Sequence, residues 1–70
     1  MPKRDIEQLM ERVIPDIKVY GKIPEDILGQ VVRRNASALG YNHEERLEAV
    51  EKVKKRLRIV DTKVVHYYSV

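Results

Sequence analysis

The C-terminal end of the chain differs in character from everything before it. Residues 62–70 are rich in β-branched and aromatic side chains, and this composition predicts a β-strand. A lone strand leaves backbone N–H and C=O groups unpaired, so it needs a neighbouring strand. The sequence offers three neighbours: residues 17–20, a second copy of the same segment, or the sheet edge of another protein. We expect an outside neighbour, because the hydrophobic surface of one copy of so short a chain is too incomplete to close over itself.

The rest of the chain is predicted to be helical. Its apolar residues recur at the three- and four-residue intervals of amphipathic helices, with charged residues between them. We expect helices over residues 3–14, 24–39 and 42–59. The predicted fold class is therefore mainly α, a three-helix bundle with a short C-terminal β-like tail (62–70), in a single small helical domain of residues 1–70.

Local signals mark the ends of the second and third helices. Pro24 suits a first helical position, and Gly40 predicts a left-handed C-terminal stop. Asn42 and Glu45 have the spacing of a capping box at the start of the third helix. The predicted core stripe of that helix consists of four aliphatic residues: Leu47, Val50, Val53 and Leu57.

Pro15 leaves the end of the first helix ambiguous. Proline inside a helix removes a backbone donor and costs about 3 kcal/mol, so the helix kinks there or ends near Ile14. We favour a helix end followed by an extended connector within residues 15–21. The alternative fold is α+β, with residues 17–20 pairing with residues 63–69.

Composition excludes several classes of protein. With 43% hydrophobic and 36% charged residues, the chain is too apolar for a disordered protein and too charged for a membrane protein. It has no cysteine, so neither a disulfide nor a thiolate metal site is available. No apolar segment approaches the roughly 20 residues of a membrane span, and the first residues lack a signal-peptide pattern. We therefore expect a cytoplasmic protein that does not bind membranes.

The net charge of +3 is concentrated towards the C-terminus. Residues 52–70 carry six bases and one acid, a net +5. This excess supports an alternative function, a small basic nucleic-acid-binding regulator that contacts phosphates through the 52–58 basic run. Its candidate contacts are two bases of the second helix and four bases of that run: Arg33, Arg34, Lys52, Lys55, Arg56 and Arg58. Glutamates alternate with these bases, for example Glu51 with Lys55 at i,i+4, and this mixed sign weakens the nucleic-acid interpretation.

Tyrosine is the only aromatic residue type, at four positions. A tyrosine buries its ring while its hydroxyl stays hydrated, which suits domain edges and interfaces. We predict an interaction surface made of tail residues and the tyrosine that follows Gly40: Val64, Val65, Tyr67, Tyr68 and Tyr41. Because neighbouring strand residues face opposite ways, we expect one of the two tail tyrosines to be exposed unless a partner covers it.

No sequence pattern indicates catalysis. His43 and His66 are the only histidines, and they lack the spacing of a metal site. The sequence has no nucleophile motif and no glycine-rich phosphate loop, and its carboxylates are spread over solvated faces. We therefore expect no enzyme activity, no cofactor, no metal and no small-molecule substrate.

One turn resembles a known arrangement. The Leu39-Gly40-Tyr41 turn, with Ala49 and Val50 after it, resembles the Leu-Gly-Tyr turn of ubiquitin-associated-like three-helix domains and of the junction-binding RuvA C-terminal domain. The resemblance is confined to residues 38–50. It implies a close turn between two helices, and no function is carried over from it.

These features favour a small non-catalytic protein-interaction or regulatory module. We expect it to act through self-association, with a homodimer favoured, or through a partner protein. Nucleic acid stays the alternative partner.

Overall fold

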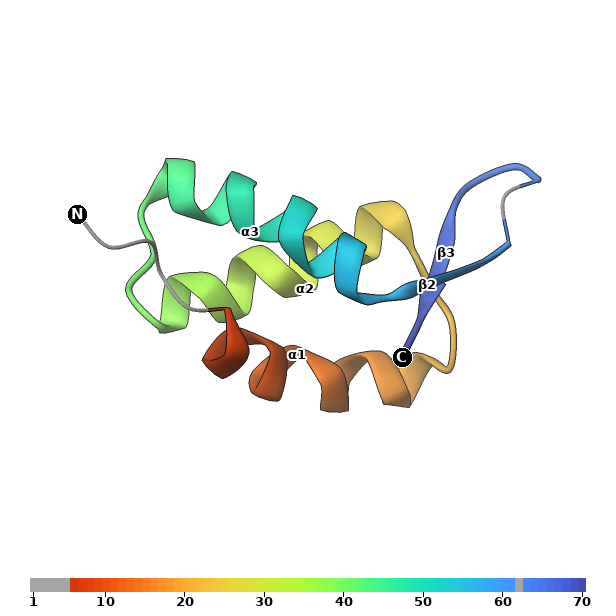
Figure 1. Ribbon diagram of the computed structural model, residues 1–70, viewed down its shortest axis with the longest axis horizontal. Coiled ribbons are helices and arrows are strands. Elements are labelled where there is room, and N and C mark those ends of the chain that lie inside the picture. The colour runs from red at the N-terminus through yellow and green to blue at the C-terminus, as the bar shows by residue number, and fades with distance from the viewer. Residues whose placement is uncertain (1–5, 62) are drawn as a thin grey trace.

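The computed structural model describes residues 6–61 and 63–70, and it is mainly α with a small three-stranded antiparallel sheet (Figure 1). The predicted fold class is confirmed. The elements in chain order are α1 (Glu7–Tyr20), β1 (Ile23–Pro24), α2 (Glu25–Ala38), α3 (His43–Arg56), β2 (Arg58–Asp61) and β3 (Tyr67–Ser69). The sheet lies at the end of the helical layer where α1 and α3 finish and α2 begins (Figure 1).

The core is formed where the three helices turn their apolar stripes towards one another. α2 packs against both α1 and α3, so it holds the helices together. Short helices are only marginally stable in isolation, and burial of such a stripe supplies most of their stability. Seven large side chains are fully buried among the residues that the structure describes: Leu9, Val13, Ile17, Ile23, Leu28, Val32 and Val53.

α1 continues through Pro15 to Tyr20, so the prediction of a helix end near Ile14 was wrong. The missing N–H of Pro15 lies on the exposed side of the helix. Continuation places Ile17 in the core at 0% exposure, and burying such a side chain contributes about 1.5–3 kcal/mol, comparable with the cost of the proline. The helix ends at Gly21, whose φ of 78° lies in a region that glycine adopts without strain. The N–H of Gly21 donates to the C=O groups of Ile17 and Lys18.

The turn between α2 and α3 follows its local signals. Gly40 adopts the positive φ expected of a helix stop, at 86°. The capping box is confirmed: the N–H of Glu45 donates to Asn42 Oδ1 and the N–H of Asn42 donates to Glu45 Oε1, each at 2.8 Å. These bonds satisfy backbone donors that the first turn of α3 leaves without partners.

α3 is shorter than predicted, and its buried side differs from the predicted one. It ends at Arg56 instead of residue 59, because Leu57 is extended and starts the chain towards β2. Leu47, predicted as a core residue, is 49% exposed, and Ala49 is buried in the stripe instead. The buried stripe of α3 therefore includes Ala49 and excludes Leu47.

The tail strand has both of its neighbours inside the chain, which corrects the expectation of a neighbouring strand from outside it. β3 is the central strand, antiparallel to β1 on one side and to β2 on the other. Tyr68 lies opposite Ile23 in β1 and Ile59 in β2, and the β2–β3 register shifts between Ile59 and Asp61. The alternative pairing with residues 17–20 was also wrong, because α1 incorporates those residues and the chain becomes extended only at Ile23.

Within residues 6–61 and 63–70, the structure contains no helix with the length and apolarity that a membrane crossing requires.

Candidate interaction surface

Large exposed hydrophobic side chains are concentrated in the last part of the chain. Among the described residues there are eight of them, and five lie on β2, on the β2–β3 connection or directly after β3. We call these five the sheet-end surface: Ile59, Val60, Val64, Val65 and Val70. The remaining three, Val19, Tyr20 and Leu47, lie on helices. Scattered exposed hydrophobic residues are ordinary, whereas clustered ones mark contact sites.

The register of the sheet explains why part of this surface is uncovered. Ile59 lies opposite Tyr68, and Val70 follows Tyr68 by two residues, so all three belong to the face that points towards the core. Tyr68 is only 5% exposed, but Ile59 is 54% and Val70 47% exposed. The helices therefore bury the part of this face where Ile23 and Tyr68 lie, and they leave Ile59 on β2 and Val70 after β3 partly accessible.

The β2–β3 connection forms one wall of an open groove. Val64, Val65 and His66 line it, and Glu25 and Asp26 at the start of α2 line the opposite side. The N–H of Glu25 donates to the C=O of His66 at 2.9 Å, which fixes the connection to the helix.

Glu25 also anchors α3 beside this groove. Lys54 Nζ lies 2.6 Å from Glu25 Oε1 and 3.3 Å from Glu51 Oε2, and His66 Nδ1 lies 4.0 Å from Glu25 Oε2. The hydrogen bond from Lys54 lowers the pKa of Glu25 below its usual value, and the bond to Glu25 raises the pKa of Lys54 above its usual value. Glu25 and Lys54 therefore form an ion pair that links α2 to α3 beside the sheet. We call this ion pair the link.

This link predicts a pH-dependent stability. A carboxyl whose pKa is lowered by folding contributes stability above its unfolded pKa of about 4.5 and loses that contribution as the pH falls through the lowered value. A raised lysine pKa contributes below about 10.5 and is lost as the pH rises through the raised value. We therefore expect Glu25→Gln to lower the free energy of unfolding at neutral pH, and we expect its difference from wild type to shrink below pH 4.5. Chemical denaturation at a series of pH values measures both.

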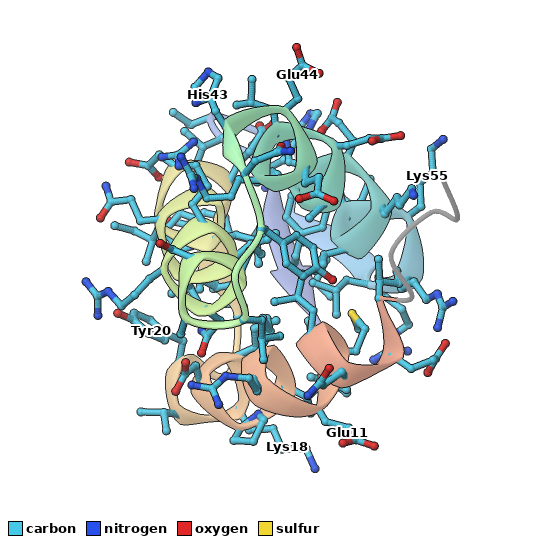
Figure 2. The ribbon with its side chains drawn as sticks, turned by 90° about the vertical axis from the view of Figure 1, so that its left-hand side faces the viewer. Glu11, Lys18, Tyr20, His43, Glu44 and Lys55 are labelled. Atoms are coloured by element: carbon cyan, nitrogen blue, oxygen red, sulfur yellow. The ribbon has the colours of Figure 1, made fainter. Side chains whose placement is uncertain are left out.

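Glu44→Gln is the matched control for Glu25→Gln. Glu44 also lies in the first turn of a helix, so it shares the favourable interaction with the helix dipole. It points away from the helices, and it forms no ion pair with the described residues (Figure 2). A difference between Glu25→Gln and wild type that is independent of pH, or equal to that of Glu44→Gln, would contradict a stabilising role for the link.

The structure separates the predicted interaction residues into two groups. Val64 and Val65 are exposed, at 94% and 41%. Tyr41 and Tyr68 lie in the hydrophobic core at 6% and 5% exposure, and the half-buried ring of Tyr67 is covered by Lys22, whose Nζ lies 4.8 Å from the ring centroid. The chain itself therefore uses its two most buried tyrosines for packing.

The predicted nucleic-acid contacts on α2 lie some distance along that helix from the 52–58 run. α2 and α3 run antiparallel, so Arg33 and Arg34 lie about 12 Å along α2 from its beginning, where the end of α3 packs (Figure 1).

Several bases of the 52–58 run are paired with carboxylates. Lys52 lies 3.9 Å from Glu48, and Arg56 donates to Glu7 on α1. Glu51 pairs with Lys54 in place of the predicted Lys55. Lys55 and Arg58 are exposed and form no ion pair with the described residues, so they are the bases of the run that remain available to a partner.

Sequence reasoning missed Ile59, Val60 and Val70 as surface residues. Residues 58 and 59 were placed in the third helix, although two consecutive β-branched residues after a charged helix end are a signal for a strand. Val70 was included in the predicted tail, but the direction in which its side chain points depends on where β3 begins.

The described residues hold no cluster of three or more histidine, aspartate or glutamate side chains arranged for a metal ion. Comparison with protein-family models, curated proteins and solved structures finds no match to the chain.

Proposed function

We propose that this chain is a small non-catalytic protein-interaction module and that the sheet-end surface contacts its partner. The observation that carries the proposal is that, of the eight exposed large hydrophobic side chains among the described residues, five lie on β2, on the β2–β3 connection or directly after β3. A partner that covers them removes apolar surface from water, which is the main driving force of protein association.

The sheet-end surface is small, so burying its apolar side chains does not by itself account for a stable interaction. Complete burial of a valine or isoleucine side chain contributes about 1.5–3 kcal/mol, and four of the five residues are already about half covered. The apolar gain is then several kcal/mol, about the same as the lowest estimates for the cost of association. Polar contacts must add to it, and backbone groups of the sheet are the nearest source.

The test compares two substitutions that each replace an exposed valine with lysine. Val60→Lys changes the sheet-end surface, and Val19→Lys changes α1 at a residue that is 85% exposed. Proteins that bind wild type and Val19→Lys but not Val60→Lys are identified by quantitative mass spectrometry and then purified. We expect a purified partner to bind wild type and Val19→Lys with Kd values within about twofold, and Val60→Lys at least tenfold more weakly, a loss of about 1.4 kcal/mol.

Thermal unfolding followed by circular dichroism checks that both variants fold. Sedimentation equilibrium of all three proteins covers the case in which the partner is a second copy, and here too only Val60→Lys should weaken association. Equal behaviour of the three proteins in both experiments would refute the proposal.

A further inference from the structure

The two edges of the sheet differ in what they offer to another strand. β1 has two residues, one of which is Pro24, and the chain enters α2 directly afterwards. Proline lacks an N–H, so this edge is poorly suited to further pairing. β2, Arg58–Asp61, has four residues and no proline, and no strand among the described residues pairs with its outer side. The outer edge of β2 therefore presents backbone groups for hydrogen bonding.

The irregularity of β2 limits what can pair there. The register shift between Ile59 and Asp61 places an extra residue, Val60, in the strand, and its side chain is 46% exposed. Short and bulged edges disfavour pairing with another rigid sheet. In a two-fold dimer through β2, both strands would carry this defect. A flexible extended segment can adjust to a bulge, so a peptide suits this edge better than a second copy.

The basic residues around this edge favour a partner with negative charge. Arg58 begins the strand, Lys55 lies in the last turn of α3, and both are exposed. Carboxylates of a partner would pair with them. Exposed aliphatic side chains at Ile59 and Val60 favour a peptide over a nucleic acid, since single-stranded nucleic acids need accessible aromatic rings for stacking and Tyr67 is covered by Lys22.

We propose that the partner is an acidic, extended peptide segment that adds as a fourth strand to the outer edge of β2. Its backbone pairs with β2, its apolar side chains cover Ile59 and Val60, and its carboxylates lie beside Arg58 and Lys55. This inference rests on the proposed function and specifies the occupant of its surface. Main-chain hydrogen bonds then supply affinity, and alternate side chains supply specificity.

The first experiment uses three blocked seven-residue peptides with the full chain. One alternates glutamate and valine, one alternates lysine and valine, and the third repeats the glutamate–valine sequence with alternate backbone nitrogens methylated. We expect the glutamate–valine peptide to bind at least tenfold more tightly than either of the others at low salt, and the largest amide shifts in NMR titration to fall at residues 58–60. Equal binding of the methylated peptide, or shifts centred elsewhere, would overturn strand addition at β2.

The second experiment changes the charge at the edge. Arg58→Glu should weaken the glutamate–valine peptide at least fivefold. The matched control, Arg34→Glu, makes the same change in net charge at an exposed residue of α2 and should alter the Kd by less than twofold. Circular dichroism confirms that both variants fold. Equal effects of the two substitutions would show that only net charge matters and would overturn the assignment to this edge.

Other occupants give distinct results. A homodimer that dissociates on Arg58→Glu, or duplex DNA that binds in an Arg58-dependent manner while the glutamate–valine peptide does not bind, would overturn the peptide proposal. If the peptide fails but Val60→Lys still weakens a purified protein partner, the inference about the partner falls and the proposed function stands.

Discussion

Replacing Leu28 with alanine is expected to remove a large part of the free energy of unfolding. Leu28 is 0% exposed on α2, the helix that packs against both others. Truncation of a fully buried leucine costs about 2–5 kcal/mol, because the transfer free energy is lost and a cavity remains. A chain of 70 residues has a total stability of roughly 4–10 kcal/mol. Urea denaturation followed by circular dichroism at 222 nm measures the loss.

Leu47→Ala makes the same chemical change at a residue that is 49% exposed. We expect it to cost less than about 1 kcal/mol, since little apolar surface is lost and no enclosed cavity forms. The comparison tests the facing of α3 directly, because helical periodicity alone placed Leu47 in the core. A larger loss for Leu47→Ala than for Leu28→Ala would contradict the arrangement of the helices.

Replacing Tyr68 with alanine is expected to cost about 3–5 kcal/mol, the range observed for large buried aromatic residues. Tyr68 is the middle residue of the central strand, and it lies opposite Ile23 on one side and Ile59 on the other. Its loss removes the large buried side chain that lies between the two edge strands. We expect a fall in the melting temperature of more than about 10 °C, measured by differential scanning calorimetry.

Tyr20→Ala is the control for Tyr68→Ala. Tyr20 is 54% exposed at the end of α1, where its side chain points away from the core (Figure 2). Its removal should cost less than about 1 kcal/mol. If Tyr68→Ala were as mild as Tyr20→Ala, the tail would not be the central strand of a packed sheet, and the sheet-end surface would lose its basis.

Replacing Tyr68 is expected to affect binding as well as stability. The helices and β3 support β2 from its inner side, and the proposed contacts use its outer edge. A variant that disrupts β3 is therefore expected to lose binding through unfolding of the sheet. For this reason the binding tests use Val60 and Arg58, which lie on the accessible side of the sheet, and leave Tyr68 intact.

Part of the fold could be predicted because the signals are local. The capping box of Asn42 and Glu45 and the positive φ of Gly40 depend only on residues a few positions apart. The three helices follow from periodicity for the same reason. Pro15 shows the limit of such signals, since its local cost was known but the compensating burial of Ile17 depends on the other helices.

The candidate site was only partly predictable. Val64 and Val65 were expected on a surface, and they are exposed. Tyr41 and Tyr68 were assigned to the same surface, but the small core of this chain draws them inward because it has no phenylalanine or tryptophan to fill it. Ile59 and Val60 were placed in or beside a helix, although the chain leaves helical geometry at Leu57.

Sequence patterns were sufficient to predict the three helices, the turn between the second and third, and the strand character of the tail, because each depends on residues close together in the chain. Three features depend on the packing of distant segments: which strands flank that tail, how far the first helix runs past Pro15, and which valines face the solvent. Strand pairing joins backbone groups that are distant in sequence, and its register fixes the facing of every side chain in the sheet. Local residue patterns do not predict that register.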